Sequence, residues 1–496
     1  MNFKTFLFAL AISCSTFLQA QNNIFLERSF WETKPNVEQV KEQISKGNNP
    51  TEKNGASFDA VVYAINNRVP IETIKYLLSL KGNEVDKVTH DGRNYLLWAG
   101  YSGNVELVQF LLEKGSDVKW KDDHGFDVVT FSAVSGNTNP KLYELYKAKG
   151  FELKNSTRNG ANALLLAAPS VKNISELDYF VKNGMSWDST DENGNNIFLN
   201  VATKGNVEIL QQLISKGIDY KKINNNNENA LLVAAKGARR HSNTLETFKY
   251  LSNLGLNIKQ TNKDENNILH YLAQSNQNWD VFEFFIQNGI DVNALNNKGE
   301  TPYLLAISRR NNTIANKLFE LTKNPIAENK EGYSALSYAV INLDSELVSK
   351  LVKNNAKLEI TTQNNESLIN LLFANFNSKK EKDFESILNL LTSQKVQPTV
   401  NSENGNTLFH ILVNENHLEL FEKAENLGVN IDQKNNEGLT PLHLAAMKSS
   451  DIATIKELVK LGANPKIKTE FEEDAKTLAL ENELLKVEKA DLQFLN

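Results

Sequence analysis

A serine between glycines is the first place where this sequence could carry chemistry. In Gly100-Tyr101-Ser102-Gly103-Asn104 the hydroxyl stands where the exposed nucleophile of many hydrolases would stand. Such a turn needs a second glycine at the position of Asn104, and it joins a strand to a helix. Here the flanking segments both have a helical apolar pattern, so we expect no catalytic serine.

Metal and cofactor sites are equally poorly supported. Residues 191–195 resemble the start of a calcium loop, but Asn196 stands where that loop needs glycine and Ala202 where it needs a bidentate glutamate. None of the seven histidines has the four-residue spacing that places two zinc ligands on one helix face. No phosphate-binding or dinucleotide-binding glycine motif occurs. We therefore expect no enzyme, no cofactor and no metal.

Glycines that end apolar-periodic stretches recur about every 34 residues. Glycine ends a helix cheaply because it adopts positive φ, and asparagine is the next best residue there. Asn324 and Asn355 occupy equivalent places where glycine is missing. The glycines are Gly47, Gly82, Gly115, Gly150, Gly184, Gly217, Gly255, Gly289, Gly428 and Gly462. The same helix ending therefore repeats along the chain.

A second recurring residue, most often glycine, lies in a polar turn upstream of each of these helix endings. A short apolar segment of helical spacing follows the turn each time, so each unit reads as turn, short helix, tight loop and second helix. Gly92, Gly125, Gly160, Gly194, Gly299, Gly332, Gly405 and Gly438 mark these turns, with Ser57, Asn227, Glu265 and Asn365 in the matching places of other units.

One segment makes the family recognisable. Thr440-Pro441-Leu442-His443-Leu444-Ala445-Ala446 resembles the signature that opens the first helix of an ankyrin repeat, and looser copies occur at residues 267–270, 301–304 and 407–410. The chain is identified as a bacterial, exported ankyrin-repeat protein with about 12 internal repeats and two terminal capping units. The resemblance implies that His270, His410 and His443 bond to the backbone of neighbouring units.

The resemblance also implies the fold class. We expect an all-α ankyrin-repeat solenoid of helix-turn-helix units with hairpin-like connecting turns, wound into a curved superhelix. A single solenoid would occupy residues 21–496, with capping units at 24–56 and 470–496 around internal repeats at 57–469. Two longer units place insertions near residues 236–243 and 375–382. The second insertion is rich in lysine with little to bury, so the first proteolytic cut is expected there.

The first twenty residues read as a secretory signal. Lys4 precedes the apolar run 6–12, and Ala20 precedes the expected cleavage site. The protein is then exported, to the periplasm or beyond the cell. Alternatively, residues 11–14 are a poor match to a lipoprotein cleavage site, and Cys14 carries a lipid anchor. No later stretch is apolar enough to span a membrane. A net charge of −6 without a basic stripe argues against nucleic acid.

The expected function is binding by a scaffold without catalysis. Ankyrin repeats usually bind proteins on a concave face built from turns and first helices, and aromatic residues and arginine dominate interface energies. We expect a monomer that binds another exported protein there; the alternative is a polysaccharide- or envelope-binding module. The candidate partner-binding residues are Phe58, His90, Arg93, Tyr101, His124 and Phe126.

Overall fold

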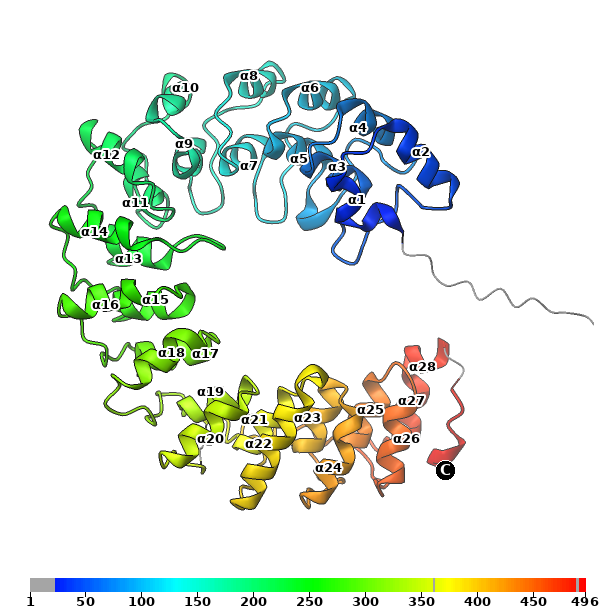
Figure 1. Cartoon of the computed structure of the whole chain (residues 1–496). Coiled ribbons are helices and arrows are strands. Elements are labelled where there is room, and N and C mark those ends of the chain that lie inside the picture. The colour runs from blue at the N-terminus through cyan, green and yellow to red at the C-terminus, as the bar shows by residue number, and fades with distance from the viewer. Residues whose placement is uncertain (1–22, 360–361, 488–489) are drawn as a thin grey trace, which may run out of the picture. The chain divides into compact units, whose positions relative to one another are not determined.

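The computed structural model describes residues 23–359, 362–487 and 490–496, so the predicted signal, including Cys14, lies outside the described residues. The described chain consists of helices and connecting turns, without strands and with three isolated β-bridges. It divides into two compact units, unit 1 up to Asn225 and unit 2 from Asn226, each a row of helix pairs (Figure 1). The all-α fold class is thus confirmed, whereas the single solenoid and its curvature stay predictions.

Unit 1 alternates a first and a second helix along the chain. The first helices are α1 (Arg28–Glu32), α3 (Ala60–Asn66), α5 (Tyr95–Ser102), α7 (Val128–Val134), α9 (Ala163–Ala167) and α11 (Ile197–Ala202). The second helices are α2 (Val37–Ser45), α4 (Ile71–Leu78), α6 (Val105–Glu113), α8 (Pro140–Ala148), α10 (Asp178–Lys182) and α12 (Val207–Ser215).

Unit 2 continues the same order. Its first helices are α13 (Ala230–Lys236), α15 (Ile268–Ser275), α17 (Pro302–Ser308), α19 (Ala335–Ile341), α21 (Leu368–Ala374), α23 (Leu408–Glu415), α25 (Pro441–Lys448) and α27 (Ala475–Glu481). Its second helices are α14 (Leu245–Asn253), α16 (Trp279–Gln287), α18 (Asn312–Phe319), α20 (Ser345–Lys353), α22 (Glu381–Ser393), α24 (Phe421–Asn426), α26 (Ala453–Lys460) and α28 (Glu483–Val487).

First and second helices differ in burial because they differ in neighbours. A first helix packs between the first helices of adjacent repeats and against its own second helix, so α5 is buried from Tyr95 to Gly100. The second helix α6 buries one stripe that includes Val108 and Leu111 and exposes Glu106, Gln109 and Glu113. Asn94 fixes the start of α5 because its side chain accepts the backbone N–H of Leu97.

The helix endings follow the predicted glycines with two exceptions. All ten glycines of the sequence pattern have positive φ, and Asn355 shares this conformation at the end of α20. The prediction for Asn324 is wrong, since α18 already ends at Phe319 and Asn324 does not have positive φ. In the unit where a glycine is missing, Lys395 has φ of 62° and follows α22.

The turns upstream of the first helices are joined to one another. The backbone N–H of His90 donates to Ser57 O at 3.0 Å, and that of Asp123 donates to Asp91 O at 3.0 Å. The same bond joins Lys263 to Asn226 within unit 2. These turns, which we call tips, therefore form a ladder in which most neighbouring tips share one backbone bond.

The predicted role of the signature histidines is confirmed. Nε2 of His270 lies 3.1 Å from Glu300 O, that of His410 lies 3.0 Å from Leu439 O, and that of His443 lies 2.7 Å from Ile467 O. In each case Nδ1 accepts the backbone N–H at the start of its own helix, so Nε2–H donates to the neighbouring repeat. The imidazoles are buried and neutral.

Acid is expected to destabilise unit 2 between about pH 6.5 and pH 4. Burial lowers the pKa of His270 from 6.5 to about 4, against a smaller opposing effect of its bond to Glu300 O. In this interval the unfolded chain binds a proton that the folded chain does not. The contribution of His270 to the free energy of unfolding is therefore fully present above pH 6.5. It is lost as the pH falls toward 4, by about 3 kcal/mol.

Thermal melts at pH 7.5 and pH 4.5 test this. Carboxylates also titrate here, so His270→Gln, which lacks the titrating group, is the matched control and its melting temperature should change less with pH. Burial lowers the pKa of His410 and His443 as well, so the stability that these two neutral imidazoles contribute is also lost in acid and adds to the effect. Equal pH dependence in the wild type and the variant would contradict the prediction.

The two insertions differ in their local structure and in the contacts they make with the rest of the chain. Residues 375–382 form a short 3-10 turn and the start of α22, and Phe376 packs edge-on against Phe384 and His417 at 5.0 and 5.2 Å. Residues 377–382 are exposed and only Asn375 and Phe376 are half-buried, which confirms the expectation that this insertion buries little. Residues 236–243 instead form a small hairpin closed by the bridge between Ala238 and His241.

Limited trypsin digestion is expected to cut first in that hairpin. Arg239 and Arg240 are both exposed there, whereas Lys380 in the other insertion donates from Nζ to Asn342 O and Leu343 O. A protease needs a locally unfolded segment, and the hairpin can open with little loss of buried surface. Mass spectrometry of the first fragments locates the cut; a first cut in 375–382 would favour the sequence-based expectation.

Candidate functional site

In several repeats the residue after the positive-φ residue of the tip packs on the residue five positions later. The rings of Phe58 and Tyr63 lie 5.7 Å apart, and those of Phe126 and Phe131 lie 5.9 Å apart. The pattern arises because the chain leaves the tip in an extended conformation and then enters the first helix, whose second turn faces back toward the tip. Each tip side chain of this kind therefore covers the exposed side of its own first helix.

Contacts between repeats join these pairs into one cluster. His90 stacks on Phe58 with ring centroids 4.3 Å apart, Phe58 approaches Trp98 at 5.9 Å, and Tyr101 stacks on Phe131 at 4.9 Å. Trp98 also meets Phe131 edge-on at 5.7 Å. We call the whole set the aromatic strip; it consists of Phe58, Tyr63, His90, Trp98, Tyr101, Phe126 and Phe131.

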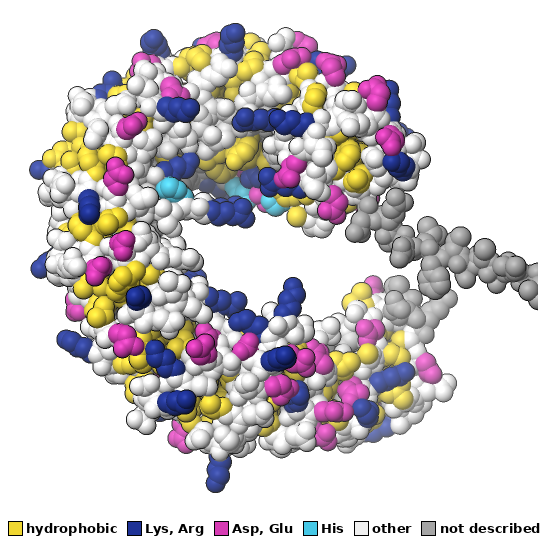
Figure 2. Space-filling view, viewed as in Figure 1, with side chains coloured by type: hydrophobic (Ala, Val, Ile, Leu, Met, Phe, Trp, Pro, Cys, Tyr) yellow, Lys and Arg dark blue, Asp and Glu magenta, His cyan; other side chains and the backbone are white. Residues whose placement is uncertain are grey.

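The strip lies wholly within unit 1. Its members come from α3, α5 and α7 and from the tips that precede these helices. In Figure 2 hydrophobic and histidine side chains gather on the side of α5 and α7 that faces away from α6 and α8. The second helices are therefore separated from the strip by the layer of first helices.

Arg93 replaces an aromatic residue at the second tip. Its guanidinium carbon lies 5.1 Å from the Trp98 ring centroid and 4.4 Å from that of Phe131. Nε donates to Asp122 Oδ2 and Nη1 to Asp91 Oδ2, both at 2.9 Å. Arg93 is only 8% exposed, so its side chain holds the strip together from beneath.

The strip leaves some rings accessible and buries others. Trp98 and Phe131 are 6% and 5% exposed and form its floor. Tyr101 is 41% exposed, and Phe58 and Phe126 are half-buried. Partly exposed rings on a fixed floor offer a partner apolar surface with little loss of side-chain entropy on binding.

The structure brings five of the six predicted residues together. Phe58, His90, Tyr101 and Phe126 belong to the strip, and Arg93 lies beneath it. His124 is separate: it has no ring contact among the described residues, and its imidazole, 59% exposed, lies 3.5 Å from Asp91 Oδ2. Sequence reasoning missed Tyr63, Trp98 and Phe131. An aromatic residue five positions after the tip in three consecutive repeats was the available signal.

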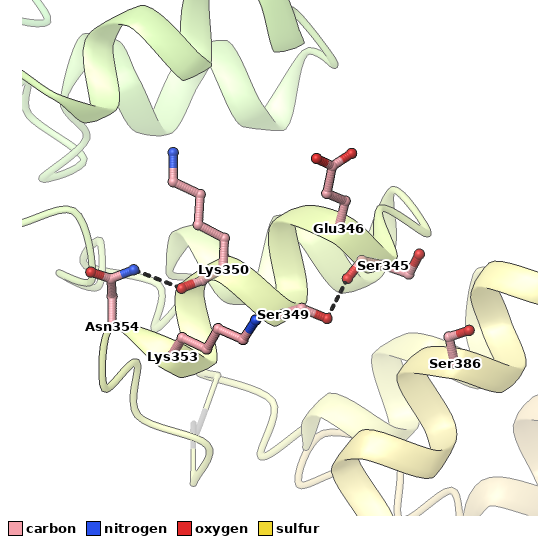
Figure 3. Close-up of a pocket in the computed structure, with 7 residues that line it drawn as sticks. All are labelled: Ser345, Glu346, Ser349, Lys350, Lys353, Asn354 and Ser386. Carbon is pink, nitrogen blue, oxygen red and sulfur yellow. Dashed lines mark hydrogen bonds between the residues drawn. The ribbon is translucent and has the colours of Figure 1, made fainter.

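A shallow groove on unit 2 contains three serine side chains (Figure 3). It lies between α20 and α22, has a volume of about 580 Å³, and is lined by Ser345, Glu346, Ser349, Lys350, Lys353, Asn354 and Ser386. Each of its serine hydroxyls donates to an acceptor of the protein, as Ser349 Oγ does to Ser345 O. The acceptors of Ser349 and Ser386 are backbone carbonyls, which cannot act as a base, whereas Ser345 Oγ donates to the carboxylate of Asp383.

The described residues contain neither a candidate metal site nor a candidate membrane span. No group of three or more histidine, cysteine, aspartate or glutamate side chains there could hold a metal ion. No described helix combines the length and the apolar character needed to cross a bilayer.

Five known proteins share sequence similarity with this chain, and three of them are compared with it here. Palmitoyltransferase AKR1 of Lachancea kluyveri is 29% identical over 34% of this chain and 23% of its own length. The putative ankyrin repeat protein FPV031 of Fowlpox virus is 26% identical over 48% of this chain and 72% of its own length. Phosphocholine transferase AnkX of Legionella pneumophila is 24% identical over 46% of this chain and 22% of its own length.

The two relatives named as transferases are matched over less than a quarter of their own lengths. Their activities therefore do not transfer to this chain. The family description "Ankyrin repeats (3 copies)" matches residues 32–122, 164–262, 237–328, 269–364 and 371–469, well over half of the chain. Together with the helix pairs, the ladder of tips and the bonded histidines, this match shows that the chain belongs to the ankyrin-repeat family.

Proposed function

We propose that this protein is a non-catalytic scaffold that binds another protein through the aromatic strip of unit 1. Ankyrin repeats generally mediate protein–protein interaction. The observation that carries the proposal is the partial exposure of Tyr101, Phe58 and Phe126 above a buried floor of Trp98 and Phe131. A contiguous exposed patch of this kind is seldom kept without a partner.

The proposal includes export of a monomer built as a single solenoid over residues 21–496. It rests on the signal-like residues 1–20, so the partner would be an exported protein, and lipid attachment at Cys14 is the alternative. Mass spectrometry of the mature protein tests this directly: loss of residues 1–20 without lipid supports secretion, whereas fatty acid on Cys14 supports an anchor.

Affinity purification of the mature protein from periplasmic and secreted fractions, with mass spectrometry of what is retained, tests the function. A protein retained by the wild type but lost with Tyr101→Ala supports the proposal. The polysaccharide alternative is tested on a glycan array, because aromatic platforms also stack on sugars. Glycan binding without a retained protein would overturn the protein-binding proposal.

A further inference from the structure

A polar pocket in unit 2 occupies the same repeat positions as the aromatic strip in unit 1. It has a volume of about 490 Å³ and is lined by tips and first helices of three consecutive repeats, those of α15, α17 and α19. Glu300 follows the turn glycine of its repeat, as Phe126 does. Ser308 lies eight positions further on, as Tyr101 does after Arg93. A carboxylate and a hydroxyl group thus stand where unit 1 has rings.

Glu300 is a buried carboxylate without a cationic partner. It is 8% exposed, and Asn296 Nδ2, at 3.1 Å, is the one donor to its carboxylate among the described residues. Lys298, which also lines the pocket, lies 3.4 Å from Glu331 instead. Burial of a charged group is costly unless hydrogen-bond donors satisfy it. Because Glu300 lines the pocket, a bound ligand can supply the missing donor.

Other lining groups offer hydrogen bonds of both kinds. Arg309 is exposed and makes no ion pair or side-chain hydrogen bond within the described part of the chain. Gln274 donates through Nε2 to His270 O, which leaves its side-chain oxygen as an acceptor. Asn266 accepts through Oδ1 from Asn296, which leaves its Nδ2 as a donor. The pocket therefore presents donors and acceptors to one ligand.

The charges of the pocket limit what this ligand is. The lining contains the carboxylates of Asp264, Glu300 and Glu331 together with the bases Lys298 and Arg309. A strongly anionic ligand meets like charge in the first set, and a strongly cationic ligand meets it in the second. A hydroxyl group both donates and accepts, so a neutral ligand with several hydroxyls satisfies Glu300 and Arg309 at once.

We propose that this pocket is a binding site for a neutral saccharide, separate from the aromatic strip. Adjacent hydroxyls of a sugar ring donate to Glu300 and accept from Arg309, and Leu305 and the ring of Tyr338 supply apolar surface for its carbon atoms. The volume lies within the roughly 300–1,000 Å³ of small-molecule sites. The inference does not depend on the proposed function, since the strip belongs to unit 1.

A glycan array of neutral, acidic and amino oligosaccharides tests the ligand class, and we expect retention of neutral ones. Isothermal titration calorimetry with the retained saccharide then tests the site. Glu300→Gln keeps an oxygen for Asn296 and removes the charge, and Arg309→Met removes the guanidinium donors. Each should lower the affinity about tenfold or more. Because Arg309 is exposed, Arg309→Met tests the site even where Glu300→Gln disturbs the fold.

Glu366→Gln is the matched control. Glu366 has the place of Glu300 in its own repeat but does not line the pocket, and its Oε2 accepts from Tyr333 Oη and Thr362 Oγ1, both at 3.4 Å. This variant should leave saccharide binding unchanged.

Three results would overturn the inference. They are retention of no neutral saccharide, tighter binding of acidic or amino saccharides than of neutral ones, and wild-type affinity in Arg309→Met. Loss of saccharide binding in Tyr101→Ala/Phe126→Ala would also contradict it, because the sugar would then lie on the aromatic strip. Saccharide binding that survives this double variant, while a retained protein is lost, supports both the pocket and the proposed function.

Discussion

Arg93→Ala is expected to lower the free energy of unfolding of unit 1 by about 3–5 kcal/mol, the usual cost of removing one partner of a buried ion pair. The variant leaves the Asp122 carboxylate buried without its cation. It also removes the group packed against Trp98 and Phe131. Denaturant titration followed by tryptophan fluorescence measures the effect, because four of the five tryptophans lie in unit 1.

The control for this prediction removes the charge together with the arginine. Arg93→Met/Asp122→Asn keeps an oxygen for the backbone N–H groups of residues 124 and 126, and asparagine already occupies the same place at the tips headed by Asn54, Asn262 and Asn296. This double variant should recover much of the lost stability. If Arg93→Ala has the same free energy of unfolding as the wild type, the guanidinium contributes little to the stability of unit 1.

Tyr101→Ala/Phe126→Ala is expected to weaken the partner complex by about 4 kcal/mol, roughly a thousandfold, at about 2 kcal/mol for each anchoring ring. Both rings lie on Phe131 and both are partly exposed. Their removal should cost the free protein little, because the floor residues Trp98 and Phe131 stay in place. Isothermal titration calorimetry with the retained partner gives the affinity, and thermal melts give the stability.

Tyr333→Ala supplies the comparison. Tyr333 occupies the position of Phe126 in its own repeat and stacks on Tyr338 at 5.5 Å, but it belongs to unit 2. It should leave the affinity unchanged. Normal binding by the double variant would show that the rings of the strip only pack the tips, and unfolding of unit 1 by the double variant would lead to the same conclusion.

The repeat could be predicted from the sequence because few residues tolerate positive φ. The glycines after second helices and at tips have that conformation, and so do Ser57 and Asn227 at matching places. The same reasoning failed at Asn324, where the helix ends earlier, and it passed over Lys395, which adopts positive φ without being glycine or asparagine. Tertiary packing, which the local pattern does not contain, decides these cases.

The candidate site was predictable only in part for a related reason. Position within the repeat located Phe58, Tyr101 and Phe126, since tips and first helices face the same side. It could not distinguish a ring offered to solvent from a group used for packing. Arg93 has the same position as Phe126, yet two carboxylates and two rings from different repeats draw it inward. That distinction depends in part on Asp122 and Phe131, which are distant from Arg93 in sequence.

The ladder of tips also has a mechanical consequence. Within a unit, neighbouring repeats hold only one another, and most neighbouring tips share one backbone hydrogen bond. A pulling force therefore loads the outermost repeat before the next one, and repeats detach in sequence. Each detachment frees about 34 residues, roughly 110 Å of extended chain. A unit stretched between two anchored partners would thus lengthen in steps, acting as a soft spring that absorbs strain before either attachment fails.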